Sequence, residues 1–473
     1  MEWGAIPLLH RFSEKSQVMI EHTGKTQGTD AISLPGPKGA PLVGHLFAIR
    51  RDPLGFLLSA ARDYGDVVPL KIGPERAYLL NHPDHIRDVL ATGNQNFVKS
   101  RGVKRAKIFL GEGLLTSEGE FWRRQRRLAQ PAFHRQRIAS YGAVMVEQAR
   151  RRSARWRDGE RFDLGKEMMQ LTLAIVGKTL FNADVEGDAE EIGAALKVIQ
   201  QNFNRLLLPF AEWLDKLPLP ANLRLWRAIE TLDAVIYRMI TERRLSGADQ
   251  GDLLSMLLLA RDEEGDGRGM DDRQLRDEAL TIFLAGHGTT ANALTWAWYL
   301  LSQNPVAEAE FHAEIEAALG DRTPEIEDLP NLRYTEMVFT EALRMYPPAW
   351  ASGRRAVNDY EIGGYRIPAG ASVLLSPWVT HHDPRYFPDP FGFKPERWTP
   401  EARAERPKFS YFPFGGGSRI CIGKSFARMK GVLLLATLAQ HWRLRLASGQ
   451  SVEPRAIITL RPACELWMTL ERR

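Results

Sequence analysis

Apolar residues recur at intervals of three and four along most of the long segments of the chain, which is the spacing of helices with one buried face. These segments are Phe121–Arg137, Tyr141–Arg157, Leu164–Phe181, Leu223–Leu245, Asp272–Gln303, Pro305–Leu319, Tyr334–Tyr346 and Cys421–Gln440. Shorter stretches, several of them bounded by Gly or Pro, are typical of strands. They are Val67–Ile72, Arg76–Asn81, Tyr360–Ile367, Ser372–Ser376 and Ala456–Leu460. The pattern predicts a mainly α protein with small β-sheets.

Composition and length set the domain organisation. The chain has 473 residues, of which 44% are hydrophobic and 26% charged, as in a globular protein with ample material for a core. A Pro/Gly-rich segment, Leu34–Leu46, separates a poorly patterned beginning from the rest. No internal repeat or Gly/Ser-rich linker interrupts the chain beyond this segment. We therefore expect an N-terminal tail over residues 1–30 and a folded body over residues 31–473.

The cysteine count and the N-terminus bear on the compartment. Only Cys421 and Cys464 occur, too few for a disulfide framework or a structural zinc site, which favours a reducing compartment. A membrane span needs roughly 20 consecutive apolar residues, and the short apolar run Ala5–Leu9 is followed by charged residues. No signal peptide is evident. We expect a cytoplasmic protein without a transmembrane anchor.

The formal net charge is +5, and its basic residues are clustered. One cluster is Lys99–Lys107; the other comprises Arg123, Arg124, Arg126, Arg127, Arg135 and Arg137. Such a face attracts phosphate, anionic lipid or an acidic protein, although a solvated helix face explains it equally well. No recognised nucleic-acid-binding module accompanies the charge, so we expect no nucleic-acid partner.

The most informative stretch is the loop FGGGSRICIG, Phe414–Gly423, which runs into a helical pattern. A thiolate is a strong, soft ligand for iron, and it stays ionised beside a metal, backbone donors or a helix N-terminus. Glycines let backbone N–H groups approach the sulfur of Cys421, which lies where a helix begins. The alternative is a buried structural cysteine at a helix start.

The loop resembles the heme-binding signature of the cytochrome P-450 family. Phe-x-x-Gly-x-Arg-x-Cys-x-Gly is matched at every fixed position, by Phe414, Gly417, Arg419, Cys421 and Gly423. The resemblance implies heme b (iron protoporphyrin IX) as cofactor, with Cys421 as the metal ligand. It covers about residues 31–473 and implies one large heme domain with the cytochrome P-450 fold.

A second match is Glu341 and Arg344, whose spacing puts both side chains on one helix face. An ordinary surface ion pair would explain this spacing too, and would contribute under about 1 kcal/mol. The pair resembles the buried Glu–Arg pair of the family, completed by the arginine of Pro-Glu-Arg, here Arg397 in FKPERW.

Three arginine or tryptophan positions match residues that bind the heme propionates in the family. Trp122 and Arg126 match Trp-x-x-x-Arg, and Arg354 falls where another such arginine is often found, beside Arg355. A guanidinium suits a carboxylate because it can bind both oxygens.

The motif AGHGTT, Ala285–Thr290, resembles the oxygen-activation groove of the family. The resemblance places Ala285 and Gly286 against the heme and makes Thr289 the hydroxyl that supports proton delivery. The usual acid is replaced by Gly288, and His287 is the neighbouring titratable side chain. A close helix–helix contact is the alternative explanation for the two glycines.

The function implied by the resemblance is hydroxylation of a lipophilic fatty acid, terpenoid or polyketide with one oxygen atom of O2, with Thr289 and Cys421 as catalytic residues. Electrons would come from a ferredoxin or flavodoxin with its reductase, docking on the basic cluster with Lys424, Arg428 and Lys430. We expect a monomer. Alternatives are a peroxide-dependent or non-oxygenating heme-thiolate enzyme and a heme-binding sensor or carrier. The expected substrate pocket comprises Ile108, Phe109, Leu110, Leu206–Phe210, Thr281, Leu284, Ala285, Ala349, Trp350 and Ala351.

Overall fold

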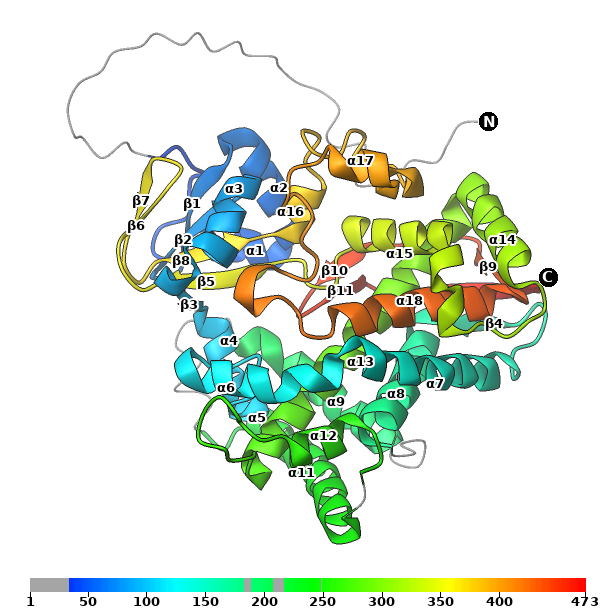
Figure 1. Ribbon diagram of the computed structural model, residues 1–473. Coiled ribbons are helices and arrows are strands. Elements are labelled where there is room, and N and C mark those ends of the chain that lie inside the picture. Colours follow the sequence, from blue (N-terminus) through cyan, green and yellow to red (C-terminus); the bar gives the residue numbers. More distant parts are fainter. Residues whose placement is uncertain (1–33, 183–188, 207–216, 248) are drawn as a thin grey trace. The chain divides into compact units, whose positions relative to one another are not determined.

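Helix α13 (Asp272–Gln303) spans 32 residues and contacts helices and strands from distant parts of the chain (Figure 1). The structure is a computed structural model that describes residues 34–182, 189–206, 217–247 and 249–473. The side chain of Asp271 caps α13 by accepting a hydrogen bond from the N–H of Gln274 at 2.8 Å. The helix ends before Pro305, which begins α14 (Pro305–Leu319).

The other described helices fall on both sides of α13 in the sequence. Before it come α1 (Leu46–Arg51), α2 (Pro53–Tyr64), α3 (Pro83–Arg87), α4 (Arg101–Arg105), α5 (Lys107–Leu110), α6 (Gly119–Ala129), α7 (Arg135–Ser153), α8 (Leu164–Phe181), α9 (Ala189–Leu206), α11 (Pro220–Ser246) and α12 (Leu253–Leu259). After α14 come α15 (Arg333–Met345), α16 (Pro377–His381), α17 (Pro400–Ala404) and α18 (Lys424–Ala439). Short 3-10 segments include η4 (Gln130–Phe133), η6 (Pro395–Trp398) and η7 (Gly417–Arg419).

The strands form small separate sheets. The largest has the order β1-β2-β8-β5-β3, in which β2 and β8 are parallel and the other pairs antiparallel. Its register pairs Val67 with Leu80 and Leu79 with Leu374. The strands are β1 (Val67–Ile72), β2 (Glu75–Leu80), β3 (Phe97–Lys99), β4 (Arg161–Asp163), β5 (Ser352–Ala356), β6 (Tyr360–Ile362), β7 (Tyr365–Ile367), β8 (Ser372–Leu375), β9 (Trp442–Leu446), β10 (Pro454–Ala456), β11 (Leu460–Pro462) and β12 (Trp467–Arg472).

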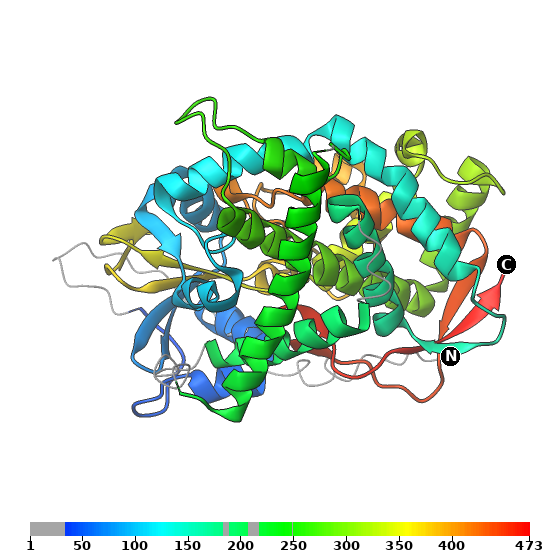
Figure 2. The ribbon, with the colours of Figure 1, turned by 90° about the horizontal axis from the view of Figure 1, so that it is seen from below.

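Two hydrophobic cores meet along α13. Its C-terminal half belongs to the larger core, where the rings of Trp296 and Tyr346 stack with centroids 3.9 Å apart. The indole N–H of Trp296 donates to the carbonyl of Leu460 at 3.2 Å, so this buried polar group is satisfied. The N-terminal half belongs to a second core with α8, α9, α11 and α12. In Figure 2 the long green helix α11 passes in front of this part.

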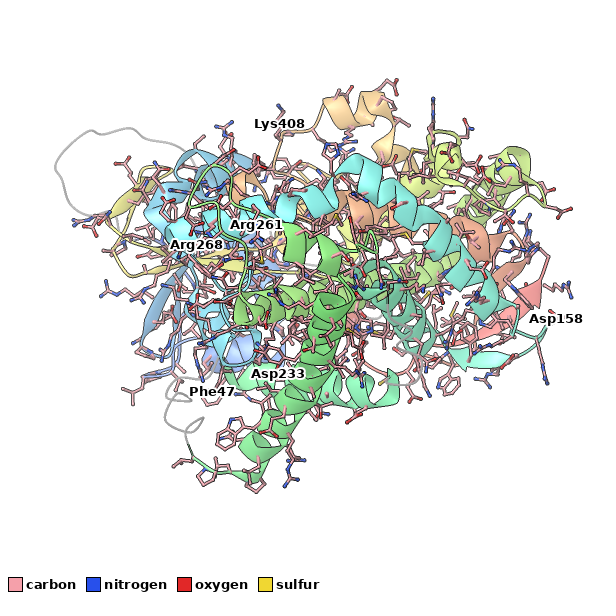
Figure 3. All side chains as sticks on the ribbon, turned by 60° about the horizontal axis from the view of Figure 1, so that its bottom comes forward. Phe47, Asp158, Asp233, Arg261, Arg268 and Lys408 are labelled. Carbon is pink, nitrogen blue, oxygen red and sulfur yellow. The ribbon has the colours of Figure 1, made fainter. Side chains whose placement is uncertain are left out.

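The loop between α12 and α13 is fastened to α6 by arginines. Arg127 donates to both carboxylate oxygens of the buried Asp262 at 3.0 Å, and Arg124 donates to the carbonyl of Arg268 at 3.1 Å. Figure 3 labels Arg268 in this loop and Asp233 on α11. Two members of the basic cluster are therefore engaged within the molecule rather than available to a partner.

The fold class expected from the sequence, mainly α with small β-sheets, is confirmed. Three predicted helices, Leu164–Phe181, Asp272–Gln303 and Pro305–Leu319, have the observed bounds. The single helix predicted over Phe121–Arg137 is wrong, because Pro131 lacks an N–H and the chain passes through η4 before α7 begins.

Two strand predictions also need correction. Tyr360–Ile367 is a hairpin of β6 and β7, because Gly363 and Gly364 both have positive φ and form its turn. Ala456–Leu460 covers the turn between β10 and β11 rather than one strand. Among the described residues, no helix is long and apolar enough to cross a membrane.

Candidate heme-thiolate site

Cys421 lies between η7 and the first turn of α18. Its backbone N–H donates to the carbonyl of Phe414 at 3.0 Å, and the N–H of Gly423 donates to its sulfur. Burial raises the pKa of the Cys421 thiol, while the Gly423 N–H, Arg126 and Lys424 act in the opposite direction. The side chain nevertheless keeps accessible surface. A cysteine whose thiol is desolvated and which still keeps accessible surface is expected of a residue that lines a binding cavity.

The shape of the cysteine loop depends on Gly417. Its φ is +64°, a conformation that side chains disfavour. A Cβ at this position would lie 1.8 Å from the carbonyl oxygen of Leu90, which is part of the short π-helical turn Asp88–Thr92. The close approach of these two backbones therefore requires glycine.

Helix α6 brings Trp122 and Arg126 to the same loop. Arg126 donates to the carbonyl of Ile420, the residue before Cys421, at 3.0 Å. The guanidinium of Arg419 lies over the ring of Trp122, 4.9 Å from its centroid. Trp122 and Arg126, which were predicted from one motif, therefore contact the loop that carries Arg419 and Cys421, which were predicted from another.

Arg354 and Arg355 are adjacent on strand β5, and their side chains point to opposite faces of the strand. Arg354 donates to the hydroxyl of Ser352 at 3.1 Å and to the carbonyl of Gly353 at 3.0 Å. Burial, followed by the charge of Arg419, lowers the pKa of Arg354 to about 10. Arg355 instead is exposed and donates to the carbonyl of Gly370 at 3.0 Å. Successive strand residues point to opposite faces, so only Arg354 reaches the interior.

Positive charge exceeds negative charge in this interior region. Arg419 pairs with Glu118, but its Nη1 is buried with no hydrogen-bond partner. Lys99 donates to the carbonyls of Leu114 and Ser117 at 2.8 and 2.6 Å, and burial lowers its pKa to about 7. Lys99 is a candidate residue that sequence reasoning missed, because its run of basic residues was interpreted as a surface patch.

On α13, Ala285 and Thr289 face accessible space, whereas most residues between 275 and 301 are buried. Ala285 is exposed and Thr289 partly exposed, and the Thr289 hydroxyl donates to the carbonyl of Ala285 at 2.7 Å. Gly286 and Gly288 instead point toward α8, where an added Cβ would lie 3.4 Å from Val176 and 3.9 Å from Met169 respectively. The helix–helix contact considered from the sequence is therefore present.

His287 is not positioned to replace the missing acid. The residue is 7% exposed, and its Nε2 is 3.1 Å from the carbonyl of Met169 on α8. Burial, followed by the charge of Lys430, lowers the pKa of His287 to about 4. The imidazole is neutral at physiological pH and is held against α8, rather than against Thr289.

The expected pocket residues divide into accessible and buried groups. Ile108, Leu284, Ala285, Ala349, Trp350 and Ala351 are at least partly exposed. Phe109, Leu110 and Thr281 are 4%, 3% and 6% exposed, and the first two belong to the second hydrophobic core. The indole N–H of Trp350 donates to the carbonyl of Ile457 at 2.9 Å. Residues 207–210 of the expected pocket lie outside the described residues.

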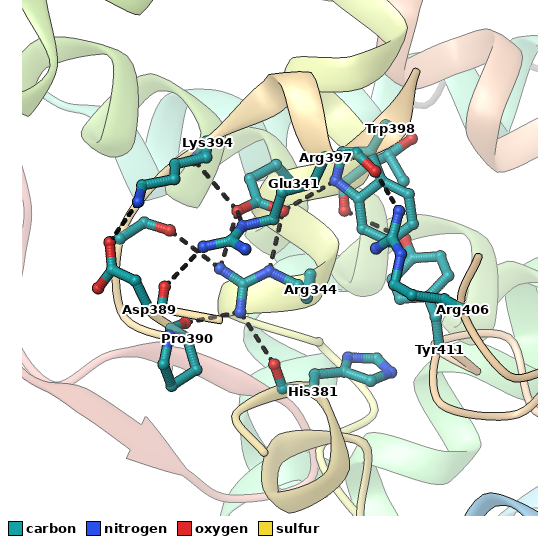
Figure 4. A network of polar contacts seen from close by, with 12 residues as sticks. Glu341, Arg344, His381, Asp389, Pro390, Lys394, Arg397, Trp398, Arg406 and Tyr411 are labelled. Atoms are coloured by element: carbon teal, nitrogen blue, oxygen red, sulfur yellow. Dashed lines mark hydrogen bonds and ion pairs between the residues drawn. The ribbon is translucent and has the colours of Figure 1, made fainter. Parts of the chain in front are cut away.

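The predicted ion network forms on α15 and η6 (Figure 4). Arg344 donates to both carboxylate oxygens of Glu341 at 2.8 and 2.9 Å, and both side chains are 0% exposed. Arg397 lies 3.4 Å from the same carboxylate, and the indole N–H of Trp398 donates to it at 2.8 Å. Arg344 also donates to the carbonyls of His381, Pro390 and Gly392. The alternative of a surface ion pair is therefore excluded.

The prediction that Lys430 lies on the surface is wrong. Lys430 was expected on a docking surface with Lys424 and Arg428, but its side chain is fully buried. Arg428 is engaged with Glu336 on α15. Of these three, Lys424 alone keeps partly exposed basic charge that no carboxylate of the described residues pairs with. The helical periodicity of the sequence did not predict the burial of Lys430, because lysine is rarely buried without an acid.

These residues fit a heme. Among the described residues no group of three or more His, Cys, Asp or Glu could hold a metal ion, so iron held by Cys421 would take its other ligands from a porphyrin. Two propionates would balance the excess of buried cations and accept from the unpartnered Nη1 of Arg419. Ala285, on α13, has a small and exposed side chain that would leave room for the group.

A mainly α fold with a cysteine loop of this kind defines a heme-thiolate protein. A sequence model described as "Cytochrome P450" matches residues 34–462. The chain belongs to the cytochrome P450 family, and it is a heme-dependent monooxygenase that uses O2 and external electrons.

Relatives from Streptomyces cover nearly the whole chain. Cyclooctatin synthase of Streptomyces melanosporofaciens is 43% identical, over 90% of this chain and 92% of its own. Cyclooctat-9-en-7-ol 5-monooxygenase of the same species is 40% identical, over 88% and 90%. Pentalenene oxygenase of Streptomyces avermitilis is 37% identical, over 90% and 94%.

Proposed function

We propose that the protein hydroxylates a C–H bond of a terpenoid, either a cyclic hydrocarbon or an alcohol derived from one. The observation that carries the substrate class is the likeness, over about nine-tenths of the chain, to an oxygenase of pentalenene and a monooxygenase of cyclooctat-9-en-7-ol. The accessible pocket positions Leu284, Ala285, Ala349 and Ala351 support this substrate class. Transfer of a lipophilic substrate from water to apolar side chains is favourable.

Cys421 is the thiolate ligand in this proposal. The bound heme supplies the oxygen chemistry, and the chain determines how it is held. Gly423 donates its N–H to the sulfur, which favours the thiolate over the thiol. Arg126, Arg354 and Arg419 would hold the propionates, with Trp122 packed under the guanidinium of Arg419.

Thr289 orders the water that donates protons in this proposal. Its hydroxyl donates to the carbonyl of Ala285, and its oxygen keeps lone pairs that can accept from a water molecule. Gly288 provides no acid at the next position, and the buried His287 provides none either. We therefore propose that water, ordered by the Thr289 hydroxyl, delivers the protons.

A ferredoxin or flavodoxin with its reductase supplies the electrons in this proposal, and the protein acts as a monomer in the cytoplasm. Arg137 is exposed, and Lys424, three residues after Cys421, is partly exposed; this positive charge favours an acidic partner. Lys424→Glu should slow reduction by the partner and weaken its dependence on ionic strength. Lys166→Glu, at the start of α8 beside β4, makes the same charge change and should leave the rate unchanged.

The decisive experiment reduces the purified protein under carbon monoxide and then supplies a terpenoid hydrocarbon with reductase, ferredoxin and O2. A strongly red-shifted Soret band that is lost in Cys421→Ala, together with an alcohol carrying oxygen from labelled O2, supports the proposal. Turnover with peroxide but none with reductant and O2 would favour the peroxide-dependent alternative. A histidine-type band would contradict ligation by Cys421.

A further inference from the structure

Lys430 is a fully buried lysine that contacts the oxygen-activation segment from the helix that follows the cysteine loop. It lies on α18, and its Nζ donates to the carbonyl of Gly286 on α13 at 2.7 Å. Its ammonium also lies over the ring of Phe426, 5.1 Å from the centroid. Helix α18, which follows the candidate heme ligand, and helix α13, which carries the candidate proton donor, are thus joined by one side chain.

The charge of Lys430 is not balanced by an acid. Within the described part of the chain no carboxylate forms an ion pair with it. Its titratable neighbour on α13 is His287, which is neutral at physiological pH because burial lowers its pKa to about 4. Burial also lowers the pKa of Lys430 to about 7. Both the ammonium and the amine have an N–H to donate, so the hydrogen bond persists in either form.

Residues 285–289 of α13, the segment that Lys430 contacts, gain from a hydrogen bond that restrains their backbone. Gly286 and Gly288 lack side chains that would restrain the backbone, and glycine in a helix costs roughly 1 kcal/mol relative to alanine. In an α-helix the carbonyl of Gly286 also accepts from the N–H of Thr290. A side-chain donor that shares this carbonyl can tilt the peptide and bend the helix locally.

Side chains hold this segment from two sides. On one side, His287 reaches the carbonyl of Met169 on α8. On the other, Lys430 holds the carbonyl of Gly286. The neighbouring carbonyl, of Ala285, accepts from the hydroxyl of Thr289 at 2.7 Å. The position of the Thr289 hydroxyl therefore depends on peptides whose orientation these two contacts set.

We infer that Lys430 is a positioning residue for oxygen activation, which fixes residues 285–289 through the carbonyl of Gly286 and so places the Thr289 hydroxyl. The inference rests on the proposed role of Thr289 and deepens it. Lys430 touches neither substrate nor cofactor in this role. It acts through the backbone of α13.

The test uses the heme-loaded enzyme and Lys430→Met, which keeps the length and the apolar stem but removes the donor. We expect amide hydrogen exchange in the peptide spanning residues 285–290 to accelerate about fivefold to tenfold, as for the loss of one hydrogen bond. We also expect more of the consumed O2 to appear as hydrogen peroxide and less as product. The carbon monoxide difference spectrum should stay unchanged.

Two further variants sharpen the test. Lys430→Gln retains an N–H donor and should partly restore both exchange and product yield. Thr437→Val removes a buried hydroxyl from the same helix, where it donates to the carbonyl of Leu433, and should alter neither measurement. If Lys430→Met fails to bind heme, Phe426→Leu removes the ring beneath the ammonium and should produce a smaller change of the same sign.

Unchanged exchange in Lys430→Met overturns the inference. Faster exchange with unchanged peroxide overturns it too, because Lys430 would then hold the helix without placing the hydroxyl. The proposed role of Thr289 fails separately, if Thr289→Ala leaves the peroxide yield unchanged. The exchange measurement still reports on the contact between Lys430 and Gly286 in that case.

Discussion

Glu341 and Arg344 form an ion pair with two hydrogen bonds and no solvent exposure on either side chain. Burying two charges is costly, and the remaining polar atoms must be satisfied if the pair is to be tolerated. Here the indole N–H of Trp398 donates to Glu341, and three backbone carbonyls accept from Arg344. The pair thereby ties α15 to the segment that leads into the cysteine loop.

Replacing Arg344 should therefore abolish stable heme incorporation. Arg344→Ala leaves the Glu341 carboxylate buried without its main partner, which costs about 3–5 kcal/mol. Heme content per protein and urea unfolding measure the effect. Arg151→Ala, which breaks the exposed pair with Glu147, should cost under about 0.5 kcal/mol and leave heme content normal. Normal heme content in Arg344→Ala would contradict a structural role for the pair.

Thr289→Ala should raise the fraction of consumed O2 that is released as hydrogen peroxide, because the hydroxyl that orders the proton-delivering water is lost. Product and peroxide are measured against oxygen consumption. Thr295→Ala is the matched control, since its hydroxyl donates to the carbonyl of Ala291 in the same way but belongs to the larger core. Equal peroxide yields in wild type and Thr289→Ala would show that protons arrive by another route.

Gly417→Ala should prevent the cysteine loop from closing. The Cβ would meet the carbonyl oxygen of Leu90 at 1.8 Å, and the backbone has a φ of +64°. We expect little heme-loaded protein and a lower melting temperature. Gly193→Ala, on α9, meets no atom within 4 Å and should stabilise the protein by about 0.5–1 kcal/mol. A heme-loaded Gly417→Ala protein of normal stability would show that the loop can move away from Leu90.

Acid should destabilise the protein through its buried histidines. Burial lowers the pKa of His287 to about 4 and that of His312 and His382 to about 3, from an ordinary value of 6.5. The unfolded chain therefore binds protons that the folded chain does not, and stability is lost as pH falls below 6.5. Each histidine contributes a slope of about 1.4 kcal/mol per pH unit in that window.

Urea unfolding between pH 7.5 and 5 measures this slope. His287→Gln keeps an amide that can donate to Met169 and should reduce the slope by the share of one histidine. His134→Gln replaces an exposed histidine and should leave it unchanged. A slope that His287→Gln does not alter would mean that His287 takes up its proton in the folded protein.

The local elements and the cysteine loop were predictable from the sequence. Periodic apolar residues reproduced the bounds of α8, α13 and α14, because each helix buries one face and is bounded by a capping residue or a proline. The motif around Cys421 predicted the loop, since glycine at 417 is required wherever that turn approaches Leu90.

Only the tertiary structure decided which side chains face the interior of the site. Arg354 and Arg355 are equivalent in the sequence, and the pairing of β5 with β8 determines that Arg354 is buried. Lysine is usually found at the surface, yet Lys99 and Lys430 are buried. Their burial is possible because carbonyl oxygens of other segments accept their hydrogen bonds. A sequence pattern records the period of burial, whereas the partner that satisfies a buried charge is determined only when distant segments pack together.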